Sequence, residues 1–125
     1  MKSYRDLEIY VVSKKLAIAA HAASLTLPKF ETYEEGSQLR RSSKAITSLI
    51  VEGYGRKRYK ADFIKYLVYS HAECDETIIH LEFILETGST KHIEDFKNLV
   101  EEYISLSKKI NKFIQWADEH WNEDQ

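Results

Sequence analysis

Apolar residues recur at intervals of three and four along most of the chain, the spacing of one face of an α-helix. The clearest run predicts a helix over about residues 60–87, with seam positions Ile64, Leu67, His71, Cys74, Ile78, Leu81 and Leu85. A second run over about residues 90–121 uses Phe96, Leu99, Tyr103, Leu106, Ile110, Phe113 and Ala117. Both runs resemble the seams of coiled coils.

The first half of the chain predicts two more helices. The stripe over about residues 6–27 consists of Ile9, Val12, Leu16, Ala19, Ala23 and Leu27. Pro28 should end this helix, because a proline disfavours helical geometry in the residue before it. The next helix, over about residues 33–52, carries Leu39, Ile46 and Leu49 or Ile50. Gly53 is expected to end it in the left-handed conformation.

Four amphipathic helices with short connections predict an all-α fold, an antiparallel up-down-up-down four-helix bundle. One proline and four glycines are few, which favours long helices over a strand-and-turn fold. With 125 residues, of which 43% are hydrophobic and 30% charged, the chain is expected to form a single domain over residues 1–125.

The chain is predicted to be cytoplasmic, with no membrane contact. Cys74 is the only cysteine, so no internal disulfide can form, and a reducing compartment is the natural reading. The first ten residues carry charges where a signal peptide needs an apolar core. No apolar run approaches the roughly 20 residues that span a bilayer.

Positive charge is concentrated in residues 37–60. This segment holds seven basic residues and one acid, a net charge of +6 in a chain whose formal net charge is −2. Basic clusters neutralise phosphates, and tyrosines stack on unpaired bases. The candidate nucleic-acid-binding residues are Arg40, Arg41, Lys44, Tyr54, Arg56, Lys57, Arg58, Tyr59 and Lys60.

Two other readings of this segment stay open. The cations can cover a solvated face, or pair with acids such as Asp62, Glu73 and Glu76. The protein can also be a self-associating scaffold whose basic stretch contacts an acidic protein surface, since segregated charge favours head-to-tail pairing.

Enzymatic and metal sites are less favoured. His71 and Cys74 lie three residues apart and could form a nucleophile or part of a metal site, but a buried thiol beside a hydrogen-bonded histidine is the simpler interpretation. The spacing of Glu76 and His80 is usual for a surface pair. The glycines at Gly53 and Gly55 do not indicate a dinucleotide-binding loop, because no strand precedes them. We therefore predict no catalytic residue, metal or cofactor.

Four short motifs in order resemble one family. They are Arg5-Asp6-Leu7-Glu8, Gln38-Leu39-Arg40-Arg41, Glu52-Gly53-Tyr54-Gly55-Arg56, and Asp62-Phe63-Ile64-Lys65-Tyr66-Leu67. Together they resemble the four-helix-bundle proteins encoded in intervening sequences of 23S ribosomal RNA genes, often described as ribosomal proteins. The accessory variability protein of diversity-generating retroelements is a relative of that family.

The resemblance implies a bacterial, non-enzymatic bundle that assembles as a ring-shaped homopentamer and binds RNA or another nucleic acid. The basic positions it implies correspond to Arg40, Arg41, Lys44, Arg56 and Lys57. The chain departs from the family pattern in two places. Leu49 replaces an asparagine, and Ala72-Glu73 replaces a Gly-Ser pair.

Overall fold

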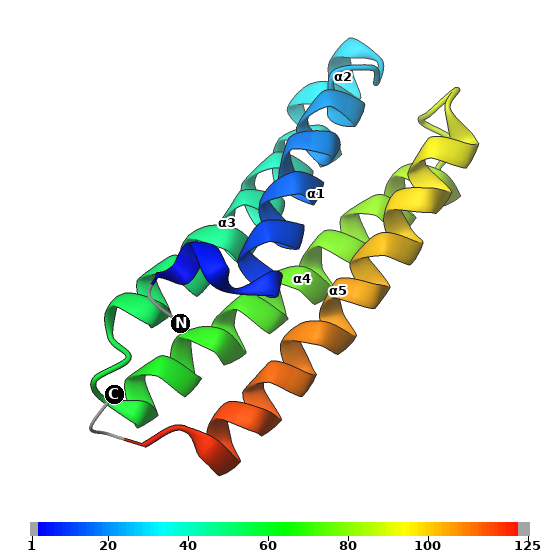
Figure 1. Ribbon diagram of the computed structural model, residues 1–125. Helices are drawn as coiled ribbons and strands as arrows, with labels where there is room; N and C mark the ends of the chain where they lie inside the picture. Colours follow the sequence, from blue (N-terminus) through cyan, green and yellow to red (C-terminus); the bar gives the residue numbers. More distant parts are fainter. Residues whose placement is uncertain (1–2, 123–125) are drawn as a thin grey trace.

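Four long helices form an antiparallel bundle in the computed structural model, which describes residues 3–122 (Figure 1). They are α1 (Glu8–Ser24), α3 (Glu35–Gly55), α4 (Lys60–Glu86) and α5 (Ile93–His120). A 3₁₀ turn, η1 (Tyr4–Asp6), precedes α1, and the short α2 (Lys29–Tyr33) connects α1 to α3. Helices α1 and α4 each pack against α3 and α5, so they lie diagonally across the bundle. The predicted fold is confirmed.

The first helix is shorter than the periodicity predicts. Residues 4–6 form η1, capped by the Ser3 side chain, and the residues after Ser24 tighten into bonds to carbonyls three positions back. Pro28 therefore acts as the N-cap of α2 rather than as the stop of α1. Glu34 then breaks the helical path, and α3 begins at Glu35.

The buried face of α4 is rotated from the predicted seam. Leu67, Cys74 and Leu81 are fully buried as expected, but the other core positions are Phe63, Ser70, Thr77 and Ile84. The predicted positions Ile64, His71, Ile78 and Leu85 are half-buried. Buried hydroxyls are tolerated because α3 accepts them: Ser70 donates to the Ile46 carbonyl at 2.8 Å, and Thr77 to Ser42 Oγ at 2.8 Å.

Gly53 does not end a helix. It is buried inside α3, which continues to Gly55, and Gly88 is the residue with a left-handed backbone (φ 69°) in the described part of the chain. A Cβ built on Gly53 would lie 2.9 Å from Tyr66 Cβ on α4. The glycine is therefore explained by the close approach of α3 and α4.

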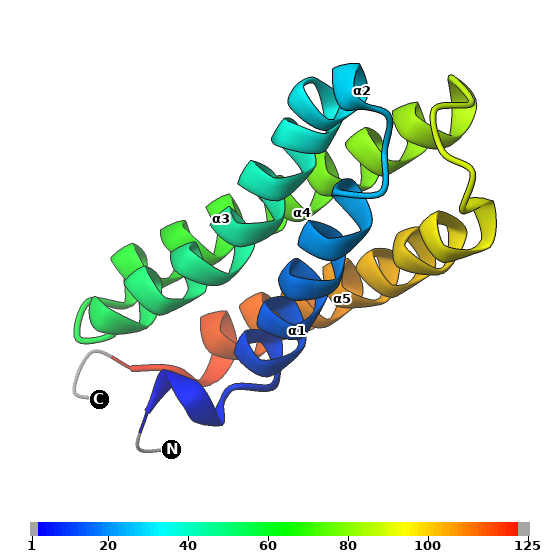
Figure 2. The same ribbon diagram turned by 90° about the horizontal axis from the view of Figure 1, so that it is seen from above.

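The ends of the described chain converge on the α3–α4 turn. Figure 2 shows η1 and the end of α5 at the same end of the bundle as this turn. The Tyr4 ring contacts the Tyr54 ring edge-on, with centroids 6.5 Å apart, and Trp121 Nε1 donates to the Lys57 carbonyl at 3.0 Å. Within residues 3–122, no helix has the length and apolar character needed to cross a bilayer.

Candidate nucleic-acid interface

The basic segment separates into two parts of the structure. Arg40, Arg41 and Lys44 lie within α3, whereas Arg56 to Lys60 form the connection to α4 and its first residue. Fifteen residues of helix between Arg41 and Arg56 correspond to about 22 Å along the axis. One compact ligand group therefore cannot contact both parts.

The Arg40 side chain links α3 to α1 and α2. Its Nη1 donates to Ser24 Oγ at 2.8 Å, at the end of α1, and its Nη2 donates to the Thr32 carbonyl of α2 at 2.9 Å. The guanidinium is thus committed to joining three helices. Arg40 therefore does not join Arg41 and Lys44 in one open basic surface.

Arg41 points the other way, toward α4. It pairs with Glu73 at 3.4 Å and with Glu76, and His80 bonds to both Glu76 and Glu35. Burial and the adjacent Glu76 carboxylate raise the pKa of Glu73. Burial also works to raise the pKa of Glu76, but His80 and Arg41 outweigh it and lower that pKa. The expected pairing of basic residues with Glu73 and Glu76 is confirmed for Arg41.

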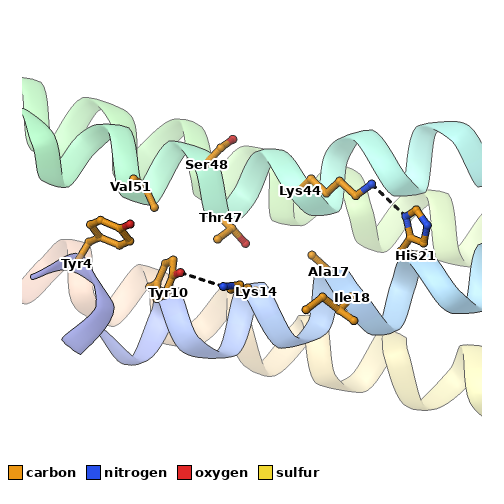
Figure 3. Close-up of a pocket in the computed structure, with 10 residues that line it drawn as sticks. All are labelled: Tyr4, Tyr10, Lys14, Ala17, Ile18, His21, Lys44, Thr47, Ser48 and Val51. Atoms are coloured by element: carbon orange, nitrogen blue, oxygen red, sulfur yellow. Dashed lines mark hydrogen bonds between the residues drawn. The ribbon is translucent and has the colours of Figure 1, made fainter.

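Lys44 lies on the rim of a groove between α1 and α3. Its Nζ is 3.0 Å from His21 Nδ1, and Lys14 Nζ bonds to the Tyr10 hydroxyl at 3.4 Å (Figure 3). The groove has a volume of about 490 Å³, and its ten lining residues include no carboxylate. Its floor is mostly apolar, with Ala17, Ile18 and Val51 among the lining residues. The sequence does not predict this groove, because its two walls come from different helices, α1 and α3.

The second part, which we call the basic turn, consists of Arg56, Lys57, Arg58, Tyr59 and Lys60. Arg56 lies 3.7 Å from Glu52 and 3.8 Å from Asp62, and its guanidinium covers the Tyr66 ring at 4.8 Å. Lys60 Nζ bonds to the Asp118 carbonyl at 2.5 Å. Among residues 3–122, no carboxylate forms an ion pair with Lys57, Arg58 or Lys60. Tyr59 is 60% exposed, and Arg58 lies over its ring.

Aromatic side chains support the basic turn from inside. Tyr54 is only 7% exposed, and its ring packs edge-on against Phe63 with centroids 6.3 Å apart. The Lys57 ammonium lies 4.5 Å from the centre of the Tyr54 ring. The expectation that Tyr54 stacks on bases is therefore corrected, since its ring belongs to the core. Tyr59 is the tyrosine that the turn presents to solvent.

The chain matches the family described as 23S rRNA-intervening sequence protein over residues 5–112. The chain belongs to this family. The match includes every residue of α3, α4 and the basic turn. No curated protein matches the chain.

A solved structure supports the fold of this 23S rRNA-intervening sequence family member. It is a protein of unknown function from the S23 ribosomal protein family of Bacteroides thetaiotaomicron, with 21% sequence identity and a TM-score of 0.76. The alignment covers 85% of this chain and 97% of that one. The similarity establishes a shared helical architecture.

His71 and Cys74 do not form a pair in this family member. His71 Nε2 bonds to Ser107 Oγ at 3.0 Å, whereas the Cys74 thiol donates to the Tyr103 carbonyl at 3.4 Å. Burial, and after it the Asp75 carboxylate, raises the pKa of Cys74 to about 12. The thiol therefore stays protonated at neutral pH, which disfavours nucleophilic chemistry. Residues 3–122 contain no cluster of three metal-ligating side chains.

The buried thiol should make the bundle sensitive to alkali. Because the pKa of Cys74 is about 12 in the folded chain and 9.0 ordinarily, only the unfolded chain releases this proton above pH 9. The contribution of this thiol to the free energy of unfolding should thus be constant below that pH and fall by about 1.4 kcal/mol per pH unit above it. Burial also raises the pKa of Tyr103, which adds to the loss at higher pH.

Urea unfolding between pH 8 and pH 10 tests this effect against a Cys74→Ala variant. The variant should show a shallower loss of stability than the unchanged protein just above pH 9. Equal slopes for the two proteins would contradict the assignment.

Proposed function

We propose that the protein is a non-enzymatic, self-associating bundle that binds RNA through the basic turn. The observation that carries this proposal is the exposure of Arg58 and Tyr59 together on a turn whose cations outnumber its acids. The family name connects its members with 23S rRNA, which favours RNA among nucleic acids. The buried free thiol fits the reducing bacterial cytoplasm in which such RNA is found.

Single-stranded RNA suits the turn best. Lys57, Arg58 and Lys60 can neutralise phosphates because no carboxylate pairs with them in the described chain. Tyr59 offers an exposed ring, and a base stacked on such a ring contributes about 1–3 kcal/mol. Stacking of this kind requires unpaired bases and tolerates any sequence.

Removal of the turn's charge should weaken RNA binding and its dependence on salt. The variant Lys57→Gln/Arg58→Gln/Lys60→Gln should lose about tenfold or more in affinity for single-stranded RNA at low salt. The logarithmic salt slope should become shallower by about 2, since each neutralised phosphate contributes about 0.7. Fluorescence anisotropy with labelled RNA at several salt concentrations measures both quantities.

A matched control removes the same charge elsewhere. Lys97, Lys108 and Lys112 are exposed on α5, and their replacement by glutamine should leave the RNA affinity and the salt slope unchanged. If both triple variants lose affinity equally, binding reflects net charge and not the turn. If the unchanged protein binds no RNA at low salt, the proposal is wrong.

A second candidate is a scaffold whose basic turn contacts an acidic protein surface. The cations that favour it are Lys57, Arg58 and Lys60, since no carboxylate pairs with them in the described chain. The Tyr59→Ala variant separates the two functions. It should weaken RNA binding by the loss of stacking, whereas binding to a carboxylate-rich protein should depend on the cations alone.

We also propose that self-association produces a closed homo-oligomeric ring, with five copies as the family resemblance implies. The unequal distribution of charge along the chain supports this. The segment over residues 37–60 carries +6 in a chain of net charge −2. Opposite charges on different faces of one subunit favour head-to-tail contacts, and such contacts close into rings when the rotation allows.

A further inference from the structure

Helix α1 carries a second apolar stripe that faces away from the core. Val11 and Ile18 of α1, and Leu25 directly after its last residue, recur every seven residues and are 53–64% exposed. They lie on the side opposite to the buried residues Ile9, Leu16 and Ala20. Lys14 and Lys15 flank this stripe, and both are exposed.

Helix α4 carries a matching stripe of the opposite charge. Val68, Ile79 and Phe83 are 44–49% exposed, and Ala72 lies between them on the same face. Spacings of four and seven residues align these positions on one side of a helix. The acids of this face are Asp75, Glu82 and Glu86.

The other two long helices lack such a stripe. No large hydrophobic side chain of α3 is exposed. On α5, the exposed residues Ile93, Ile104 and Trp116 are eleven and twelve residues apart, and charged residues such as Lys97, Glu101 and Lys108 lie between them, so they form no continuous stripe. Two outward apolar stripes on diagonal helices are thus a specific property of α1 and α4, and they lie on opposite sides of the subunit.

The two stripes lie at the same position along the bundle axis; residues at the same position along this axis are called level. Thr47 Oγ1 donates to Ser13 Oγ of α1 at 2.9 Å, and Ser70 Oγ of α4 donates to the adjacent Ile46 carbonyl at 2.8 Å. Ser13 and Ser70 therefore lie at the same height on α3. Because α1 and α4 are both antiparallel to α3, they run in the same direction (Figure 1).

This level relation pairs the stripes residue by residue. A position on α1 is level with the position 57 residues later on α4, as Ser13 is with Ser70. Val11 is then level with Val68, Ala22 with Ile79, and Leu25 with Glu82, next to Phe83. Lys15 lies one helical turn from the level of Asp75. Glu8 lies level with Lys65, which has the opposite charge.

We propose that the outward face of α1 in one copy binds the outward face of α4 in the next copy, with the two helices parallel and level. This proposal rests on the self-association in the proposed function and names its two surfaces. Rotation about an axis along the bundle, without translation, preserves the level of each residue, so the pairing above is the one a closed ring requires. In this arrangement the groove beside Lys14 and Ile18 is level with residues 71–75 of α4 in the neighbouring copy.

Charge reversal tests the two surfaces separately. The variants Lys14→Glu/Lys15→Glu and Asp75→Lys/Glu82→Lys each create like charges across the contact. Each should sediment as a monomer at a micromolar concentration where the unchanged protein associates. An equimolar mixture should associate again into alternating chains or even-numbered rings, because the two reversed faces carry opposite charges and so do the two native faces. A ring of five cannot alternate without one contact between like charges, so the mixture need not recover the mass of the unchanged assembly.

The control Lys108→Glu/Lys112→Glu makes the same change in net charge as Lys14→Glu/Lys15→Glu, but on α5, and should leave the mass of the assembly unchanged. Circular dichroism confirms that each variant is folded. The proposal is overturned if the unchanged protein is a monomer, if either reversed variant keeps its assembly, or if the mixture stays monomeric. A contact of α1 with α1 would leave the Asp75→Lys/Glu82→Lys variant assembled.

Cysteine cross-linking tests the level pairing. In a Cys74→Ser background, Val11→Cys with Val68→Cys should oxidise to a ladder of linked chains. Val11→Cys with Phe83→Cys, displaced by about 22 Å along the helix, should not. Equal ladders would overturn the parallel, level arrangement.

RNA binding distinguishes this proposal from the proposed function. A monomeric charge-reversal variant keeps an intact basic turn, and it should still bind RNA with an unchanged salt slope per subunit. The turn variant should lose RNA but stay assembled. Loss of assembly only in the α1 and α4 variants supports the interface, whatever the result with RNA.

Discussion

Replacement of Gly53 by alanine is expected to lower the free energy of unfolding by about 2 kcal/mol, and replacement by leucine by about 3 kcal/mol or more. The cause is steric, because a Cβ at this position would lie 2.9 Å from Tyr66 Cβ. That atom is attached directly to the backbone of α4, so relief requires the two helices to separate. Urea unfolding followed by circular dichroism measures the loss.

Gly55 provides the matched control for this prediction. It lies in the same helix two residues later, but a Cβ there would meet no atom within 4 Å. Gly55→Ala should therefore be neutral or stabilise the protein by up to about 1 kcal/mol, the difference in helix propensity. If both alanine variants lose the same stability, then helix approach does not explain Gly53.

Replacement of Arg40 by methionine should cost about 2–3 kcal/mol of stability. Methionine keeps much of the apolar stem but removes the bonds to Ser24 and to the Thr32 carbonyl, and bonds from a charged donor contribute about 1.5–3 kcal/mol. RNA affinity measured below the unfolding transition should not change, because Arg40 does not lie in the basic turn.

Arg41→Met is the natural comparison for Arg40. Arg41 is about half exposed, and exposed ion pairs contribute at most about 1 kcal/mol. If the Arg40→Met variant stays stable but loses RNA affinity, Arg40 belongs to the RNA-binding surface. A large loss of stability in the Arg41 variant alone would reverse the roles assigned to the two arginines.

The four helices and their order are predictable from periodicity, but the phase of each buried face is less so. Polar Ser70 and Thr77 break the apolar pattern of α4, and the sequence does not show that α3 supplies acceptors for their hydroxyls. The apolar pattern therefore predicts a seam through Ile64 and Ile78, which are apolar but only half-buried in the structure. A hydrogen bond between helices can decide which side of a helix is buried.

The candidate site shows a similar limit. Arg40 and Arg41 are adjacent in sequence, yet consecutive residues of a helix point about 100° apart, so one joins α1 and α2 while the other pairs with α4. Tyr54 and Tyr59 have the same side chain, and only the length of α3 decides that Tyr54 is buried. No local pattern predicts that Trp121, distant in sequence, contacts the Lys57 carbonyl.

The contact of Trp121 with the basic turn also affects the entropy of binding. The indole holds the backbone at Lys57, while its ring packs against Phe63 with centroids 4.8 Å apart. A loop that orders only on contact with its ligand loses binding free energy to that ordering. Here the backbone is already fixed in the free protein. A ligand at this turn therefore has to restrict only the exposed side chains, such as Arg58 and Tyr59.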